Sequence, residues 1–205
     1  MEETAVLVGV NLNNQEDFQY LMEELRNLAD ACDLKVAGEV TQKISEVNTG
    51  YYIGTGKIQE LSHVMEETGA DVAVFNDELT PTQIRNLEEE LKCKVIDRTM
   101  LILDIFAQRA KTKEAKLQVE IAQLQYTLPR LIGLRESLGR QSGGVGTRNK
   151  GAGEKKLELD RRKIEERINL LNKELKELVV NRETQRSKRR KNEIPIVSLV
   201  GYTNA

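Results

Sequence analysis

The last residues of the sequence have the spacing of a phosphate-binding loop. An apolar run of strand length, residues 196–200, leads directly into Gly201-Tyr202-Thr203-Asn204-Ala205. Such a loop follows a buried strand with the pattern G-x-x-x-x-G-K-[ST]; its backbone N–H groups cradle phosphates, and its hydroxyl holds Mg²⁺. Gly201 would be the first glycine and Ala205 the last spacer. A glycine after a strand also marks ordinary turns, so spacing alone leaves both interpretations open.

Residues 139–153 form a glycine-rich basic segment with six glycines, three cations and no acidic residue. Glycine allows close backbone approach to a partner, and Arg and Lys neutralise phosphates, which favours a contact with structured RNA. The candidate contacts are Arg140, Gly143, Gly144, Gly146, Thr147, Arg148 and Lys150. Flanking cations would extend the positive field: Arg130, Arg135, Lys155 and Lys156. A flexible solvated turn is the alternative, although a turn needs fewer glycines.

The segment Gly54-Thr55-Gly56-Lys57 resembles a phosphate-binding loop only superficially. Its spacing is wrong and no Ser or Thr follows Lys57. A helix start is the better interpretation. A nucleotide or RNA-backbone contact through Gly54, Gly56 and Lys57 stays open, because glycines before a helix N-terminus form a generic anion site.

We find no set of residues in the sequence that predicts catalysis or metal binding. His63 is the only histidine and lies within an expected helix, without a catalytic partner. Cys32 and Cys93 are too far apart for a CxxC pattern and have no histidine nearby, which is typical of reduced thiols in a cytoplasmic protein. We therefore predict no catalytic residue and no metal ligand among these residues.

The first part of the sequence alternates strands and helices. A continuous apolar run predicts a strand at residues 5–10, and further strands are expected at 34–40, 71–75 and 94–96. Helical spacing predicts helices near residues 18–28, 58–65 and 81–91. Thr80 followed by Pro81 is a typical helix start. The fold class expected is α/β, with a small, mainly parallel sheet and flanking helices. The strand order cannot be read from one sequence.

The second part predicts a long antiparallel helical hairpin, similar to a coiled coil. Two helical stretches are expected, one over residues 99–138 and one over residues 154–190. Leucine and isoleucine recur in both at steps of three and four: Leu117, Ile121, Leu124, Leu128 and Leu131, and then Ile164, Ile168, Leu171, Leu175 and Leu178. We expect Pro129 to kink or restart the first helix.

The charge distribution separates the two parts. Residues 1–107 carry 8 Lys and Arg against 21 Asp and Glu, a net charge of −13, whereas residues 108–205 carry 23 against 12, a net charge of +11. The basic half is the candidate for nucleic acid. We predict three units: an α/β domain over 1–97, a hairpin over 98–192 and the start of a further domain over 193–205. Neither a membrane span nor a secretory signal is expected.

Several segments together resemble the HflX family of ribosome-associated GTPases, in that family's order and over nearly the whole chain. They are residues 52–57 (YIGTGK), 75–88 (FNDELTPTQIRNLE), 95–99 (VIDRT), 105–110 (IFAQRA), 117–124 (LQVEIAQL), 143–148 (GGVGTR), 159–162 (LDRR) and 200–205 (VGYTNA). The resemblance implies an amino-terminal α/β domain, a helical hairpin and then a domain that binds GTP and Mg²⁺.

The resemblance also implies partners and roles. The family binds the large ribosomal subunit and its RNA and splits or rescues stalled ribosomes, and the loop that matches Gly143 to Arg148 reaches ribosomal RNA. Residues 201–205 would be the first part of the GTP site, so these 205 residues alone should neither bind GTP there nor hydrolyse it. The segment after Arg148 departs from the family, because it lacks the Gly-Pro-Gly-Glu that many members have.

Two other functions stay open at this point. One is a non-enzymatic RNA-binding module, which the absence of Gly-Lys-Ser/Thr in the next residues of the parent gene would favour. The other is an amino-terminal domain around residues 54–57 that uses ATP and remodels RNA.

Overall fold

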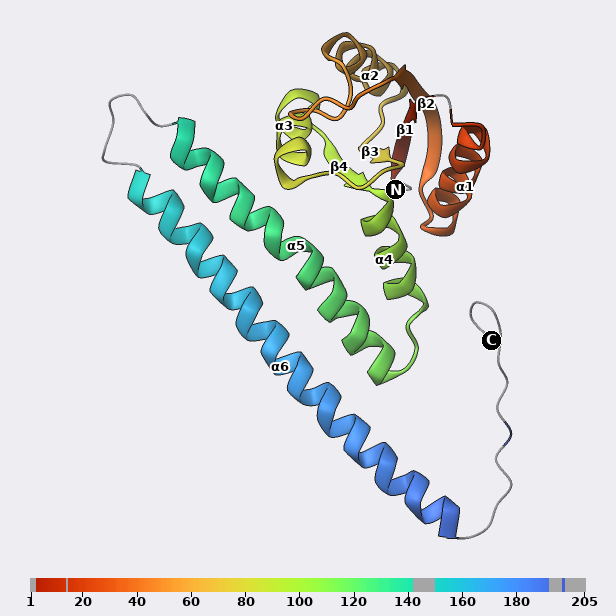
Figure 1. Ribbon diagram of the computed structural model, residues 1–205, viewed down its shortest axis with the longest axis vertical. Coiled ribbons are helices and arrows are strands. Elements are labelled where there is room, and N and C mark those ends of the chain that lie inside the picture. Colours follow the sequence, from red (N-terminus) through yellow and green to blue (C-terminus); the bar gives the residue numbers. More distant parts are fainter. Residues whose placement is uncertain (1–2, 14, 142–149, 192–196, 198–205) are drawn as a thin grey trace.

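The computed structural model describes residues 3–13, 15–141, 150–191 and 197, with side chains for residues 3–13, 15–130, 158–187 and 197. Within these residues the chain forms a small α/β domain followed by two long helices that lie side by side (Figure 1). The expected fold class is confirmed. No helix in the described part of the chain is long and apolar enough to cross a membrane.

Four parallel strands form one sheet, in the order β2-β1-β3-β4. Their bounds are β1 Thr4–Leu12, β2 Lys35–Ile44, β3 Val72–Phe75 and β4 Lys94–Asp97. The fully buried run of β3 explains its continuous apolarity, because the central strands are covered on both faces. Strand β2 lies at the edge, and its residues alternate between exposed and inward-facing, with Val40 buried. It runs to Ile44, beyond the expected residues 34–40.

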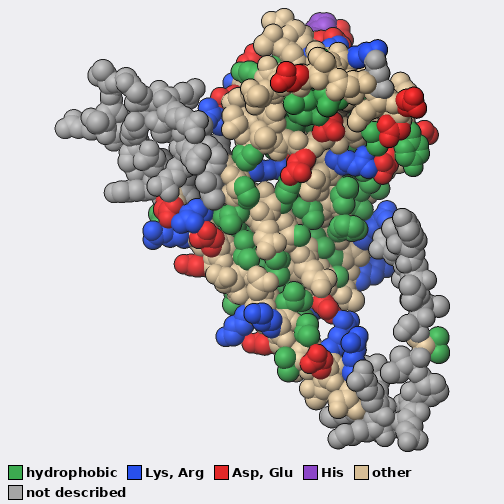
Figure 2. Space-filling view, in the orientation of Figure 1, with side chains coloured by type: hydrophobic (Ala, Val, Ile, Leu, Met, Phe, Trp, Pro, Cys, Tyr) green, Lys and Arg blue, Asp and Glu red, His purple; other side chains and the backbone are tan. Residues whose placement is uncertain are grey.

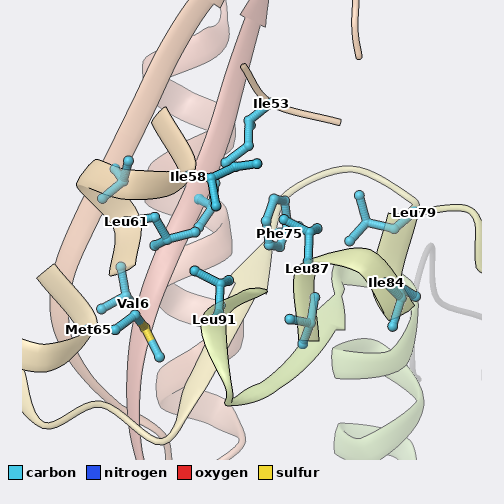
Figure 3. Packing of buried hydrophobic residues seen from close by; sticks show 14 of the residues in the cluster. Val6, Ile53, Ile58, Leu61, Met65, Phe75, Leu79, Ile84, Leu87 and Leu91 are labelled. Carbon is cyan, nitrogen blue, oxygen red and sulfur yellow. The ribbon is translucent and has the colours of Figure 1, made fainter. Parts of the chain in front are cut away.

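Four helices cover the two faces of the sheet. They are α1 Phe18–Ala31, α2 Thr55–Thr68, α3 Pro81–Leu91 and α4 Arg98–Arg109. Helices α2 and α3 pack on the face that Val6 and Val8 present, around Phe75, Leu61 and Leu87 (Figure 3). Helices α1 and α4 pack on the opposite face, on which Leu7 and Val74 lie. The sheet is therefore the middle of three layers.

Local signals explain where α3 begins and how closely α1 packs on the sheet. The Thr80 side chain accepts a hydrogen bond from the Gln83 backbone, and the Gln83 side chain accepts one from the Thr80 backbone, so α3 begins with the expected cap. Gly9 lets α1 approach β1 closely, because a Cβ atom there would lie 2.2 Å from Sδ of Met22.

The expected single helix over residues 99–138 is wrong. Helix α4 ends at Arg109, and α5, Lys113–Gln141, begins after a short break. Ala110 has extended backbone angles, and the Thr112 hydroxyl accepts a hydrogen bond from the Ala115 N–H, which caps α5. The break lets α4 stay on the sheet through Leu101 and Ile105 while α5 leaves it.

Helices α5 and α6, Lys150–Lys191, form the antiparallel hairpin. Leu171 is 1% exposed and packs with Leu117 and Ile121, and four further leucine and isoleucine side chains border this cluster: Leu124, Ile168, Leu175 and Leu178. Arg167 pairs with Glu120 at 2.7 Å across the two helices. Helix α5 runs through Pro129 without ending, so the chain does not restart there, and a kink at Pro129 stays a prediction.

Candidate functional site

The carboxyl ends of β3 and β4 place Asn76, Asp77 and Asp97 at one edge of the sheet. Carboxyl ends of parallel strands are where open α/β sheets generally bind ligands. Asp97 ends β4, directly before α4, and its side chain is fully buried. A buried carboxylate requires partners for both oxygens, so its contacts decide what this edge can do.

Asp97 accepts hydrogen bonds from four donors. Its Oδ1 atom accepts from the Met100 N–H at 3.0 Å and caps α4. Its Oδ2 atom accepts from the Leu79 N–H at 3.2 Å, from Nη2 of Arg130 at 2.9 Å, and from the Tyr126 hydroxyl. Arg130 and Tyr126 belong to α5, so this carboxylate joins the sheet to the hairpin rather than facing a ligand.

Arg130 and Tyr126 also contact each other. The guanidinium carbon of Arg130 lies 4.1 Å from the centre of the Tyr126 ring, which is a cation–π arrangement. Burial raises the pKa of Tyr126 above its ordinary value, and the hydrogen bond to Asp97 raises it further. The phenol therefore keeps its proton and remains a donor to Asp97. We call Asp97, Tyr126 and Arg130 the Asp97 joint.

Arg98 makes a second set of polar contacts beside the joint. Its Nη1 atom donates to Oδ1 of Asn76 at 3.2 Å, and its Nη2 atom pairs with Glu24 of α1 at 2.7 Å. The segment VIDRT at residues 95–99 therefore ties β4 to α1, β3 and α5. The polar side chains of Asp97 and Arg98 in this segment bond to other parts of the protein.

Residues 48–54 form an ordered loop at the same edge, held mainly by α3. Gln83 donates to the Asn48 carbonyl at 2.9 Å, and Asn86 donates to the Gly50 carbonyl at 2.9 Å. Tyr52 packs edge-on against Phe75, with 6.3 Å between ring centres. Burial raises the pKa of Tyr52, and a hydrogen bond with Asp77 adds to the shift.

Gly54, Gly56 and Lys57 lie where α2 begins, as the sequence predicted for a helix start. Gly54 is the residue before the first turn, and its N–H donates to Oε1 of Gln42 at 2.9 Å. The Lys57 ammonium pairs with Glu60 at 2.7 Å. Because both of these donors already have partners, a nucleotide or RNA contact at this place stays a prediction.

The histidine and the cysteines have no catalytic setting in the described part of the chain. His63 is exposed on α2, and its Nε2 atom lies 3.2 Å from Oε1 of Glu67. Cys32 and Cys93 are not disulfide-bonded, and burial raises the pKa of both thiols. Among the described residues no group of three His, Cys, Asp or Glu could hold a metal ion.

The two nucleic-acid and nucleotide sites expected from the sequence lie largely beyond the described residues. Helix α5 reaches Gln141 and α6 begins at Lys150, so both helices extend into the expected loop 139–153. Gly143, Gly144, Gly146, Thr147 and Arg148 lie outside the described residues, as do Gly201 to Ala205 and the side chains of Arg140 and Lys150. Val197, in the expected strand 196–200, is 87% exposed and is not in a strand.

Comparison with known proteins identifies the family. Residues 19–107 match the GTP-binding GTPase N-terminal family, and residues 109–189 match the GTP-binding GTPase Middle Region family. Over 204 residues the chain is 52% identical to a GTPase HflX of Caldanaerobacter subterraneus, with all of this chain and 47% of the relative covered. The chain belongs to the HflX family. It corresponds to the amino-terminal and middle regions of these GTPases.

Other HflX relatives and solved structures agree. GTPase HflX of Escherichia coli K12 is 43% identical, with 99% of this chain and 47% of the relative covered. The chain spans about half the length of the curated relatives it matches. A GTP-binding protein of Sulfolobus solfataricus, solved with GDP, is 27% identical with a TM-score of 0.58, covering 87% of this chain and 46% of that one. Another structure, titled a complex of SsGBP and GDP, has a TM-score of 0.65 at 26% identity, covering 89% and 46%.

The HflX chain contains one long-range contact of the candidate site that sequence reasoning missed. Arg130 was expected to extend the positive field of the basic loop, but its charge is paired with Asp97. That expectation is wrong, because the α/β domain lies against this part of α5. The available signal was the spacing of Tyr126 and Arg130, which places two polar side chains on one face of a helix.

Proposed function

We propose that the parent of this HflX chain hydrolyses GTP and acts on the large ribosomal subunit to split or rescue stalled ribosomes. In this proposal residues 1–205 dock the protein, and the segment 142–149 between α5 and α6 contacts ribosomal RNA. The observation that carries the proposal is the hairpin of α5 and α6, which we call the arm. The Leu171 cluster holds its two helices together, and α5 packs against the α/β domain. A stiff arm can deliver a glycine-rich loop into structured RNA.

The charge along the arm supports contact at one of its ends. Residues 158–185 carry seven basic and seven acidic side chains. Many of them pair: Arg161 contacts Glu158 and Glu165, and Arg182 pairs with Glu114 at 2.5 Å. Hydrogen bonds from Arg161 and then Arg162 lower the pKa of Glu158 to about 2. Figure 2 likewise shows basic and acidic side chains interspersed over the described part of the hairpin.

Excess positive charge lies in two segments of the basic half. Residues 131–157 carry six basic and two acidic residues, and residues 186–191 carry five basic and no acidic ones. The two segments flank the balanced stretch, and residues 150–157 of the first and residues 186–191 lie at opposite ends of α6. Phosphate attraction should therefore be weakest along the middle of the arm, and of the two segments only 131–157 combines excess positive charge with glycines.

GTP and Mg²⁺ are proposed as ligands of the whole protein, since the family is one of GTPases. Gly201, Tyr202, Thr203, Asn204 and Ala205 would supply backbone N–H groups to the phosphates. The remaining Gly-Lys-Ser/Thr positions, which reach the terminal phosphates and Mg²⁺, are not among these 205 residues. We expect residues 1–205 to show no GTP hydrolysis, and turnover by the purified chain would contradict this assignment.

The docking proposal is tested by sedimentation with purified large ribosomal subunits at several salt concentrations. Replacing Arg140, Arg148 and Lys150 together with Ala should weaken binding at least tenfold and reduce its salt dependence. The matched control removes the same charge from the other end of α6, through Arg186, Lys188 and Arg189. An equal loss in both triple variants, or none in the first, would reject the loop as the contact.

A further inference from the structure

The hairpin and the α/β domain have separate apolar cores. The cluster around Leu171 in the hairpin contains no residue of either cluster that packs on the sheet. Helix α5 nevertheless lies against α3 and α4. Among the residues whose side chains the structure describes, no buried apolar cluster spans the two parts, so polar contacts are the candidates for setting the angle between them.

Polar contacts occupy the side of α5 that faces the domain. Gln123 donates to Oδ1 of Asp104 on α4 at 2.9 Å, and Tyr126 and Arg130 bond to Asp97. These three residues recur at steps of three and four, so they share one face of the helix. Leu117 and Ile121, which pack on α6, lie on the opposite face. Helix α5 is thus held between α6 and the domain.

We propose that the Asp97 joint sets the direction of the hairpin, with Tyr126 and Arg130 as positioning residues for the loop that follows α5. This inference rests on the proposed function, in which that loop contacts ribosomal RNA. Hydrogen bonds to a fully buried carboxylate depend strongly on geometry, whereas apolar contacts tolerate sliding. Losing one donor removes a hydrogen bond to the Asp97 carboxylate, and water cannot replace it because Asp97 is fully buried.

The length of α5 amplifies small changes at the joint. At 1.5 Å per residue, α5 is roughly 42 Å long, and about 16 Å of it lies beyond Arg130. A rotation of about 10° around its first turn would displace its end by roughly 7 Å. That distance is larger than a hydrogen bond, so a loosened joint would misplace the loop without unfolding either part.

The direction of the hairpin can be measured with two nitroxide spin labels. Suitable sites are exposed side chains on α2 and α6, through His63→Cys and Lys163→Cys. The native thiols should react more slowly than the introduced ones, because Cys32 is buried, Cys93 is half-buried and burial raises the pKa of both. Electron paramagnetic resonance then reports the distribution of distances between domain and hairpin.

Tyr126→Phe removes one hydroxyl, and Arg130→Gln removes the paired charge. Each should at least double the width of the distance distribution and weaken binding to large ribosomal subunits about fivefold, with the helical content unchanged by circular dichroism. Arg130→Lys, which keeps the charge near Asp97, should recover part of both losses. Arg167→Gln breaks an exposed pair between α5 and α6 and should change neither measurement.

The outcomes separate this inference from the docking proposal. An unchanged distribution in both joint variants would overturn the inference, and so would a broadened distribution with unaltered binding. If the unmodified chain does not bind subunits at all, the docking proposal fails. The role of the joint in directing the hairpin is then decided by the distances alone.

Discussion

The Nη2 atom of Arg130 lies 2.9 Å from Oδ2 of Asp97, although 33 residues separate the two in sequence. The pair connects the middle of α5 with the carboxyl end of β4. Asp97 is fully buried and the Arg130 side chain is 18% exposed. A partly shielded pair of this kind depends on both partners, because either one alone would be left as a poorly solvated charge.

Asp97→Ala should lower the free energy of unfolding by about 3 kcal/mol. The substitution removes the cap of α4 and leaves the Leu79 N–H, the Tyr126 hydroxyl and Arg130 without their acceptor. Asp97→Asn keeps the shape and should cost about half as much. Urea denaturation provides the measurement. Glu120→Ala, at an exposed ion pair, is the control and should cost less than about 1 kcal/mol.

Two tyrosines should resist ionisation at high pH. The pKa values of Tyr126 and Tyr52 are raised in the folded protein, chiefly by burial and then by carboxylate hydrogen bonds. The unfolded chain releases these protons near pH 10, as free tyrosine does, so stability is complete below about pH 10 and falls as the pH rises further. Ultraviolet absorbance of tyrosinate should show a late phase. Tyr126→Phe should halve that phase, and adding Tyr52→Phe should abolish it.

The cap of α3 should be worth about 1 kcal/mol. Thr80→Ala removes the oxygen that accepts the Gln83 N–H, and Gln83 also holds Asn48 in the neighbouring loop. Hydrogen exchange at residues 48–54 should therefore accelerate together with the loss in stability. Thr82→Ala, at an exposed position in the first turn of the same helix, should change neither quantity. Equal effects of the two substitutions would show that the cap contributes nothing specific.

The strands and three of the four covering helices could be predicted from the sequence because their signals are local. The apolar run at residues 72–75 and the Thr80-Pro81 pair each determine structure within a few residues. The strand order 2-1-3-4 depends on contacts between distant segments, which no local pattern contains. The break between α4 and α5 had one signal, Thr112 as a cap, but Ala110 and Lys111 are good helix formers and concealed it.

The candidate site was harder to predict, because its chemistry depends on pairing. Arg130 taken alone is a cation near a basic loop, and only the fold brings Asp97 to it. Pro129 predicted a kink or restart from its missing N–H. In the structure Tyr126 and Arg130 anchor α5 on both sides of Pro129, and the helix continues through it. Long-range contacts therefore hold the two sides of Pro129 in one helix, which no local pattern predicts.

The hairpin core offers a matched test on neighbouring residues. Leu171 is 1% exposed and packs against Leu117 and Ile121, whereas the neighbouring Leu170 is 50% exposed. Leu171→Ala should lower the free energy of unfolding by about 2–4 kcal/mol, because it leaves a cavity between the helices. Leu170→Ala should change it by less than about 1 kcal/mol, since alanine also favours helix. Denaturation followed by circular dichroism measures both. If the two variants had the same free energy of unfolding, the Leu171 cluster would not be what holds α5 and α6 together.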